Sequence, residues 1–163
     1  MENNRRWLVY ANESKCNHVK AFSEIGYVSW NPHNRRFKVG DIVFMFLSID
    51  RSVRFKTKVT AVDIPRTDQK YWSNTPSNSP TCKLDFVAEY NGELLNEEEL
   101  KKHGFKGGGS IEQPMCGNRE LLDYIEQTIA EREAFYLQAH AVINANNTQQ
   151  AIEQICDYLQ NVK

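Results

Sequence analysis

The stretch FKVGDIVFMFLS, residues 37–48, contains the longest strongly apolar run of the chain, the six residues IVFMFL. A run of this length directly after a Gly-Asp pair is typical of a short strand that is buried on both faces of a sheet. It is far shorter than the ~20 residues that a membrane-spanning helix needs. The stretch therefore predicts a central strand of a globular domain over residues 41–48.

Three neighbouring segments predict further strands of the same sheet. The segment VRFKTKVTAVD, residues 53–63, alternates between apolar and polar residues, which predicts a half-exposed strand in a hairpin with 41–48. RRWLVYA (5–11) and CKLDFVAEY (82–90) are rich in β-branched and aromatic residues and predict two more strands. The side chains expected on one face of the alternating strand are Val53, Phe55, Thr57, Val59 and Ala61.

The helical segments lie near the start and at the end of the chain. Residues 12–26 predict a short helix with Ser14 as a candidate N-cap and Gly26 at its end, and residues 96–105 predict another. The segment 118–161 is expected to be helical with a break at NANNTQQ. Asn118 is its candidate N-cap, and an apolar stripe follows at helical spacing. The stripe consists of Leu121, Leu122, Ile125 and Ile129.

This pattern of short strands, one early helix and a helical end predicts an α+β protein. We expect a small, partly closed β-barrel of about five to six strands with helices packed around it. The predicted binding domain spans residues 1–127, and residues 128–163 form a helical C-terminal extension. The extension is expected either to fold back, to form a homo-oligomer contact, or to lead toward a further domain.

Composition restricts the chemistry that is open to this chain of 163 residues. The N-terminus has no apolar segment of a secretory signal, so a cytoplasmic location is the default expectation. The four cysteines are widely spaced and form no C-x-x-C pair, which predicts free thiols rather than disulfides or a metal site. No cofactor is predicted.

Motifs of catalysis are not recognisable in the sequence. KGGGS, residues 106–110, lacks the G-K-[ST] ending of a phosphate-binding loop, and no G-x-S-x-G is present. The four histidines stand outside any catalytic motif, and NEEEL is typical of an acidic first helical turn. We therefore expect that the chain is not an enzyme.

Charge is distributed unevenly along the chain, although the net charge is −1. Residues 1–87 contain 14 lysines and arginines against 8 acidic residues, whereas the remainder is acidic. A basic half can supply a phosphate-binding surface, although basic residues on alternating strand positions can also be merely solvated. The candidates for phosphate contacts are Arg35, Arg36, Lys38, Arg54, Lys56 and Lys58.

Two tryptophans, Trp30 and Trp72, stand in segments that read as polar loops. Core tryptophans usually lie in apolar periodic segments, so these rings are candidates for the walls of a pocket. An indole that stacks on a nucleobase contributes about 1–3 kcal/mol. The alternative is that each ring closes one end of the barrel by ordinary packing.

The order of the segments resembles the PUA-like superfamily, in particular its EVE and YTH branches. RRWLVYAN and HVKAFSEIGYVSWN are similar to the first strand and the helix that lead into the pocket of YTH domains. FKVGDIVFMFLS resembles the EVE pattern in which Gly-Asp opens a strand, and DQKYWSN precedes the strand CKLDFVAEY as a second pocket tryptophan does. HGFKGGGSIEQPMCGNRELLDYI resembles the end of EVE-like modules in prokaryotic modified-DNA restriction proteins.

The resemblance implies a reader that holds a modified, typically methylated, base flipped into an aromatic cage, without catalysis. It implies DNA more than RNA as the partner, and a restriction or defence system with a nuclease effector or a fused domain. Asn31 departs from the serine that usually follows the first YTH tryptophan. The residues implied at the base are Trp30, Trp72, Asn12, Asn31, Leu47, Ser48 and Tyr71.

Two other functions remain open from the sequence. The first is a protein-interaction or regulatory module in which the aromatic residues pack internally and the C-terminal helices dimerise. The second is an enzyme built on a PUA-like barrel that acts on RNA or on a small nucleotide, which the missing nucleophile and metal motifs disfavour.

Overall fold

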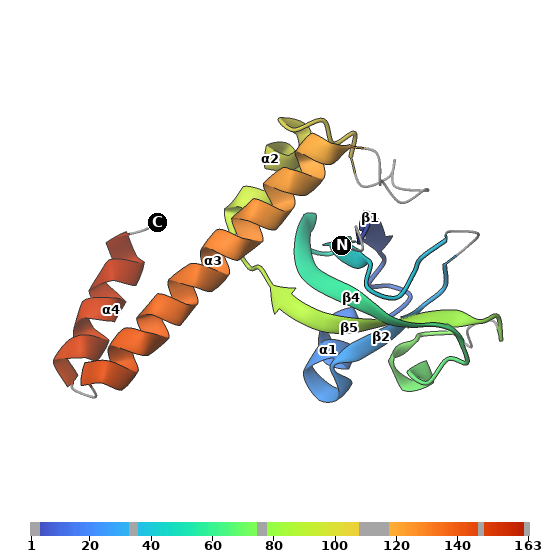
Figure 1. Cartoon of the computed structure of the whole chain (residues 1–163), viewed down its shortest axis with the longest axis horizontal. Helices are drawn as coiled ribbons and strands as arrows, with labels where there is room; N and C mark the ends of the chain where they lie inside the picture. Colours follow the sequence, from blue (N-terminus) through green and yellow to red (C-terminus); the bar gives the residue numbers. More distant parts are fainter. Residues whose placement is uncertain (1–3, 33–35, 75–77, 108–117, 147–148, 162–163) are drawn as a thin grey trace.

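Five strands form one mixed sheet in the computed structural model, which describes residues 4–32, 36–74, 78–107, 118–146 and 149–161. The order across the sheet is β1-β3-β4-β5-β2 (Figure 1). β1 and β3 run parallel, and the other neighbouring pairs are antiparallel. The strands are β1 (Arg6–Ala11), β2 (Tyr27–Trp30), β3 (Ile42–Leu47), β4 (Ser52–Ile64) and β5 (Thr81–Glu89).

The helices lie on both faces of this sheet and beyond its edge. α1 lies beside β2, whereas α3 crosses the opposite side and continues away from the strands (Figure 1). They are α1 (His18–Ile25), η1 (Gln69–Tyr71), η2 (Glu93–Leu95), α2 (Glu97–Lys101), α3 (Arg119–Asn146) and α4 (Gln149–Asn161), where η1 and η2 are 3-10 helices. None of the described helices is both long and apolar enough to cross a membrane.

The sheet is open within the described part of the chain, because β1 and β2 form its two edges and no ladder joins them. The combination of this sheet with helices confirms the predicted α+β class. The predicted closure into a barrel is not confirmed. β4 is the longest strand and is strongly curved (Figure 1). Its pairing with β5 shifts register at three places, and such bulges bend and twist a strand.

β3 is the central strand that the sequence predicted, with side chains buried on both faces. Val43, Met45 and Leu47 join an α1-side core, which also contains Phe22, Val28, Phe55 and Val59. Phe44 and Phe46 join an α3-side core, which also contains Leu8, Val53, Leu100, Leu121 and Ile125. All five of these β3 side chains are fully buried.

A bulge in the pairing of β3 with β4 places Val53 and Phe55 on opposite faces of the sheet, although the sequence predicted that they share one face. Met45 pairs with Phe55, but the next residue, Phe46, pairs with Val53, so the register shifts between them. Val53 consequently packs in the α3-side core while Phe55 packs in the α1-side core. The strict alternation of the sequence could not reveal the one extra residue that changes the face.

The first helix begins later than the sequence predicted. Asn17, not Ser14, is the N-cap of α1, and its side chain accepts a hydrogen bond from the Lys20 N–H at 3.0 Å. Ser14 instead donates its N–H and hydroxyl to Asn12 Oδ1 at 2.9 and 2.7 Å, which forms a turn. Gly26 ends the helix as predicted, at a left-handed φ of 74° that glycine adopts without strain.

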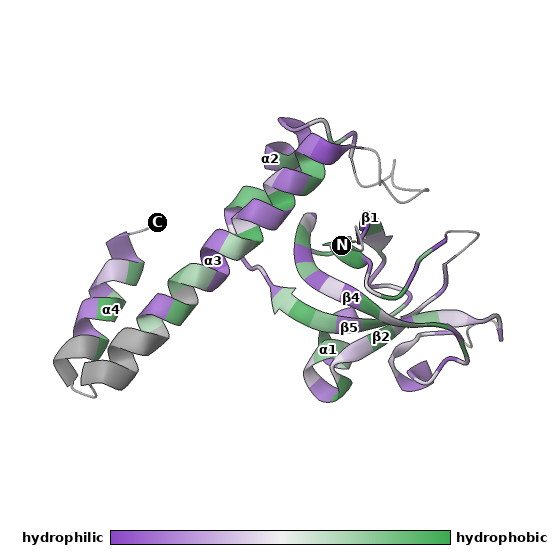
Figure 2. Cartoon of the chain, viewed as in Figure 1, coloured by the Kyte–Doolittle hydropathy of each residue, from purple (hydrophilic) through white to green (hydrophobic). Residues whose placement is uncertain are grey.

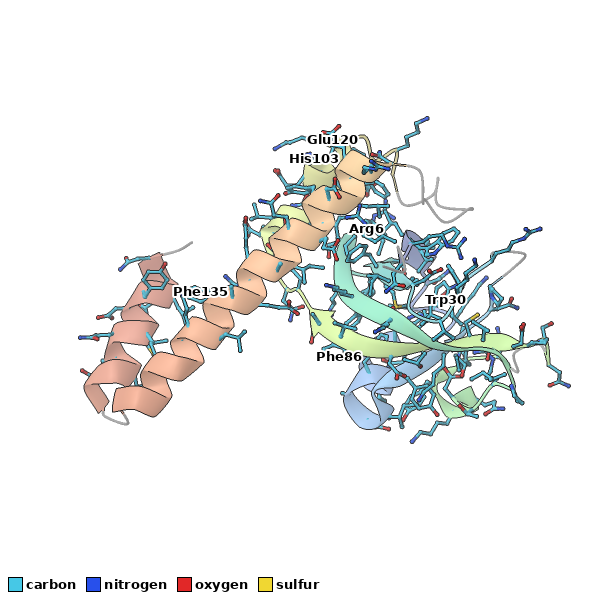
Figure 3. All side chains as sticks on the ribbon, in the orientation of Figure 1. Arg6, Trp30, Phe86, His103, Glu120 and Phe135 are labelled. Carbon is cyan, nitrogen blue, oxygen red and sulfur yellow. The ribbon has the colours of Figure 1, made fainter. Side chains whose placement is uncertain are left out.

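The C-terminal helices form an arm that starts on the sheet. Asn118 caps α3 as predicted, accepting from the Leu121 N–H at 3.1 Å, and the predicted stripe from Leu121 to Ile129 is buried. Arg6 on β1 is ion-paired with Asp123 and Glu126 of α3 (Figure 3). Farther on, α4 folds back along α3, and the predicted boundary at residue 127 lies inside α3.

Hydrophobic residues are frequent along the strands, whereas hydrophobic and hydrophilic residues alternate along α3 from its start (Figure 2). The helix predicted over 96–105 is shorter, since α2 ends at Lys101. β2 is a strand that the sequence did not predict. Most of KGGGS, residues 106–110, lies outside the described residues.

Candidate functional site

Trp30 is the last residue of β2, and it is not in a polar loop as the sequence suggested. It pairs with Cys82 of β5, and its side chain packs in the α1-side core with 9% of its surface exposed. Figure 3 shows Trp30 in the sheet, well away from the arm formed by α3 and α4. The main chain of Trp30 is therefore fixed by strand pairing.

Trp72 does lie in a loop, directly after η1, and it is half-buried. It forms an isolated bridge with Cys16. Two backbone hydrogen bonds flank it: the Asn17 N–H donates to the Tyr71 carbonyl, and the Ser73 N–H donates to the Lys15 carbonyl, both at 2.9 Å. The loop that carries Trp72 thus lies on the turn that leads into α1.

His18 brings the two tryptophans together, although no sequence motif marked it. Its ring lies 6.0 Å from the ring of Trp30 and 6.3 Å from the ring of Trp72, measured between centroids. The side chain is 2% exposed, and Nδ1 lies 2.9 Å from Oε1 of Glu13. Only the packing of α1 against β2 and η1 places this histidine beside both indoles.

Arg66 and Asp68 form a buried ion pair that holds both indoles in place. Arg66 lies over the Trp72 ring, with Cζ 4.1 Å from its centroid, and Nη1 donates to the Ser29 carbonyl at 2.6 Å and to Asp68 at 3.2 Å. Asp68 accepts the Ser29 N–H at 2.8 Å. Because Ser29 precedes Trp30, this clamp connects the positions of the two rings.

Three N–H donors in this cluster are buried and have no hydrogen-bond partner among the described residues: Trp30 Nε1, Trp72 Nε1 and Arg66 Nε. The third tryptophan differs, since Trp7 Nε1 donates to Asp41 at 2.9 Å. A buried donor without a partner costs about 1–3 kcal/mol, and most buried polar groups in proteins are paired. The folded cluster therefore lacks hydrogen-bond acceptors for three buried N–H groups, which lowers its stability.

Cys16 lies beside the same cluster and is fully buried. Burial, together with the nearby carboxylates of Asp68 and Glu13, raises the pKa of its thiol to about 12, while Arg66 acts in the opposite direction. The thiol is therefore protonated at neutral pH, which is the opposite of an activated nucleophile. No group of three or more His, Cys, Asp or Glu side chains in the described ranges is arranged to hold a metal ion.

The other residues predicted at the base lie around this cluster to different degrees. Asn12 and Ser48 follow the parallel strands β1 and β3, and Ser48 Oγ accepts the N–H of Glu13, the residue that contacts His18. Leu47 is fully buried in the same core as Trp30. Tyr71 is buried with its hydroxyl donated to Glu24 at 2.8 Å, and Asn31 is half-buried after β2. Their roles at a base stay predictions.

The basic residues predicted at phosphates fall into different environments. Arg36, Lys38 and Lys58 are exposed, and Arg35 lies outside the described residues. Arg54 pairs with Asp50 and Glu89, and Lys56 lies 3.6 Å from Glu126 of α3. Lys56 therefore lies on the α3 side of the sheet, opposite the core that contains Trp30.

Two hollows of the described chain lie elsewhere. One, of about 300 Å³, is lined by polar residues that include Asp50, Arg54 and Asn96. The other, of about 280 Å³, lies between α3 and α4 beside Phe135 and Tyr158. Neither is lined by Trp30 or Trp72, whose indole nitrogens are shielded from solvent. The indole nitrogens of the cluster are thus closed to solvent in this conformation, although Trp72 is only half-buried.

The fold and this cluster define an α+β module with a buried aromatic site. No protein-family model and no curated protein matches the sequence.

Solved structures do share the fold. A hypothetical protein from Leishmania major is similar with a TM-score of 0.51 and 16% identity, covering 81% of this chain and 98% of its own. Protein Atu2648 from Agrobacterium tumefaciens has a TM-score of 0.50 and 16% identity, covering 76% and 92%. The Pho92 YTH domain in complex with m6A has a TM-score of 0.42 and 16% identity, covering 73% and 77%. At that score the likeness carries no information on function.

Proposed function

We propose that this chain is a nucleic-acid reader that holds a modified base between Trp30 and Trp72 and does not itself catalyse a reaction. The observation that carries the proposal is the meeting of these two indoles around His18, each with a buried N–H that lacks a partner. The resemblance of the sequence to EVE and YTH modules supports the same site. It also supports modified DNA in a prokaryotic defence system, with a nuclease effector, as the setting.

Trp72 is the wall that moves to admit a base. Trp30 is fixed by its strand, whereas the loop of Trp72 is held by two backbone hydrogen bonds to Lys15 and Asn17 and by the Arg66 contact. A hydrogen bond contributes about 1 kcal/mol net to a folded protein. Stacking on a base returns about 1–3 kcal/mol per ring, so two rings can offset the opening.

Affinity for the flanking phosphates would come from the exposed basic residues. Arg36 and Lys38 are exposed. Lys58 is exposed as well but shares the α3 side of the sheet with Lys56, and Arg54 and Lys56 are already close to carboxylates. Phosphate contacts position a strand without reading its sequence, so selectivity belongs to the aromatic cluster.

Replacement of Trp30 by alanine tests the proposal. We expect wild type to bind at least one oligonucleotide that carries N6-methyladenine, 5-methylcytosine or 5-hydroxymethylcytosine more tightly than its unmodified form. Trp30→Ala should weaken that binding by about tenfold, the equivalent of one lost stack. The measurement is calorimetric titration of matched DNA and RNA oligonucleotides.

The matched control is Trp7→Phe, because the Trp7 indole is bonded to Asp41 and lies outside the cluster. This variant should bind as wild type does. Equal binding of modified and unmodified oligonucleotides, unchanged by Trp30→Ala, would remove the reader function.

A second function, that of a protein-interaction module, is favoured by the arm. α4 exposes Ile152, Tyr158 and Leu159, and the facing part of α3 exposes Leu137, which is 71% accessible. α4 and the later part of α3 lie where the arm extends away from the sheet (Figure 1). Exposed large apolar side chains on such an arm are candidates for a contact surface.

The oligomeric state tests this second function. If the arm forms a homodimer, Leu159→Glu in the full chain should convert it to a monomer, because a buried charge is costly to desolvate. Light scattering across a concentration series measures the mass, and Glu153→Gln, an exposed change on the same helix, serves as the control. A monomeric wild type at every concentration would exclude self-association through the arm.

A further inference from the structure

Two exposed lysines, Lys15 and Lys70, lie next to Trp72 on segments that are far apart in the sequence. The Ser73 N–H donates to the Lys15 carbonyl at 2.9 Å, and Cys16, the residue after Lys15, forms a bridge with Trp72. Lys70 is part of η1 and precedes Trp72 by two residues. The loop that carries Trp72 therefore has a lysine on its own segment and another on the turn beside it.

Lys20 of α1 is connected to Lys70 through one shared carboxylate. Lys20 Nζ lies 3.7 Å from Glu24 Oε1, and Lys70 Nζ lies 3.3 Å from Glu24 Oε2. The Glu24 carboxylate also accepts from the Tyr71 hydroxyl at 2.8 Å, which ties α1 to η1. The three lysines near Trp72 are called the lysine rim below, and they are Lys15, Lys20 and Lys70.

The lysine rim keeps a positive charge after its ion pairs are counted. In the described part of the chain, the ion pairs of these three ammonium groups involve one carboxylate, that of Glu24. The contacts with Tyr71 and Glu24 raise the pKa of Lys70, so its ammonium stays charged at neutral pH. The side chains of Lys20 and Lys70 are 60% and 66% exposed, so an anion in solution can reach them.

A base held between the two indoles leaves its sugar and phosphates outside the cluster. Trp30 is buried in β2, whereas Trp72 is half-buried in a surface loop, so the base enters on the Trp72 side. A phosphate group is charged and is costly to bury without a paired cation. The backbone of the strand therefore stays at the surface next to Trp72, where the lysine rim lies.

We infer that the lysine rim holds the phosphates on either side of the bound base. This inference rests on the proposed function and specifies the surface along which its nucleic acid runs. It adds three contacts to those proposed for Arg36 and Lys38. The chemistry that the rim recognises is a phosphodiester backbone, which DNA and RNA share. Because phosphate contacts carry no sequence information, the rim contributes affinity and position, and the aromatic cluster contributes selectivity.

The salt dependence of binding tests the lysine rim. Matched single-stranded DNA and RNA oligonucleotides, with and without the modified base that wild type prefers, are titrated by fluorescence anisotropy at several NaCl concentrations. Each phosphate contact on a single strand contributes about 0.7 to the slope of log K against log salt. We expect Lys15→Ala and Lys70→Ala each to reduce that slope by about 0.7 and the affinity by up to about fivefold.

This loss should be equal for modified and unmodified oligonucleotides, since the rim does not contact the base. It should be measured on whichever of DNA and RNA wild type binds more tightly, which also identifies the partner. Trp30→Ala should behave in the opposite way, with a reduced preference for the modified base and an unchanged salt slope.

Two control variants accompany these substitutions. Lys58→Ala removes an exposed lysine on the α3 side of the sheet and should keep the wild-type affinity and slope. Lys70→Arg keeps the charge next to Trp72 and should keep the slope as well. This second control separates the loss of a phosphate contact from a loosening of the Trp72 loop.

Glu24→Gln should produce a gain of binding, which damage to the fold does not explain. The amide keeps an acceptor for the Tyr71 hydroxyl but no longer neutralises Lys20 and Lys70. We expect all the oligonucleotides to bind about twofold to fivefold more tightly at low salt. Glu153→Gln changes the net charge equally at an exposed position of α4 and should bind as wild type does.

The outcomes separate the lysine rim from the reader function. Salt slopes that stay unchanged in Lys15→Ala and Lys70→Ala, or that fall as much in Lys58→Ala, would overturn the rim. Discrimination that depends on Trp30 would keep the reader function in place in that case. Rim variants that reduce the slope, without any Trp30-dependent discrimination, would overturn the reader function and leave the rim as a non-selective nucleic-acid surface. An absence of binding to every oligonucleotide would overturn both.

Discussion

Replacing Arg66 with alanine is expected to lower the free energy of unfolding by about 3–5 kcal/mol, as the loss of one partner of a buried ion pair does. The Arg66 side chain is 6% exposed and that of Asp68 is fully buried. Without the guanidinium, the Asp68 carboxylate would keep the Ser29 N–H but lose its charged partner. Urea unfolding followed by circular dichroism measures the change.

The same substitution should also loosen the aromatic cluster, since Arg66 covers the Trp72 ring and bonds to the residue before Trp30. Tryptophan fluorescence of the folded variant should shift to longer wavelength as Trp72 becomes solvated. Arg119→Ala, an exposed arginine at the start of α3, is the matched control. A change in the free energy of unfolding as small as that of Arg119→Ala would contradict the proposed role of the Arg66–Asp68 ion pair in holding the two indoles.

A double-mutant cycle measures the interaction energy between Arg66 and Asp68. Asp68→Ala in the Arg66→Ala background should cost much less than Asp68→Ala alone, because the buried carboxylate has already lost its partner. Interaction energies between residues in contact are about 0.5–3 kcal/mol. Strictly additive effects would mean that the two side chains act independently.

Replacing Asp41 with alanine is expected to lower the free energy of unfolding by about 3 kcal/mol, because hydrogen bonds to a charged acceptor contribute about 1.5–3 kcal/mol each and are not additive. The Asp41 carboxylate is 3% exposed. It accepts from the Arg5 N–H at 3.2 Å, Arg5 Nη2 at 3.0 Å, Trp7 Nε1 at 2.9 Å and the Lys38 N–H at 3.0 Å. These donors come from the start of β1 and from the segment before β3.

The loss would leave buried donors without an acceptor where β1 and β3 begin. Asp41→Asn keeps the shape but turns an amide donor toward other donors, so it should recover little of the stability. Asp157→Ala, at an exposed position of α4, is the control. If Asp41→Ala stays within about 0.5 kcal/mol of wild type, the range of ordinary surface changes, the carboxylate does not organise this corner.

Gly40 explains why the Gly-Asp pair precedes β3. Its φ is 96°, and a Cβ at this position would lie 2.8 Å from Asn4 Oδ1. The Gly40 N–H donates to the Val59 carbonyl at 2.8 Å, which ties the turn to β4. Gly40 thus allows the chain to turn tightly just before Asp41, whose carboxylate accepts the hydrogen bonds described above.

Much of the fold was predictable where the signal is local. The two-faced strand at 42–47, the hairpin with β4, Gly26 at the end of α1 and the Asn118 cap of α3 were each predicted from residues within one segment. β2 was missed because Tyr27–Trp30 spans four residues and is specified by pairing with β5. The bulge that turns Val53 to the α3 side was missed because it too depends on pairing with another strand, here β3.

The candidate site was predictable only in part. Trp30 and Trp72 were identified from their polar neighbours, and the structure brings both to one histidine. His18, Glu13, Arg66 and Asp68 were not identified, because nothing in their own segments marks them as partners. A buried Arg-Asp pair spaced by one residue looks in sequence like any solvated loop.

The order of residues specified four of the five described strands, the end of α1 at Gly26, the Asn118 cap of α3 and the two apolar faces of β3, since hydrophobic periodicity and capping act between near neighbours in the chain. The meeting of two indoles, a histidine and an ion pair came from β2, η1 and α1 packing together, which depends on contacts between distant segments. Long-range pairing and desolvation set those contacts, and neither leaves a periodic signal in the sequence.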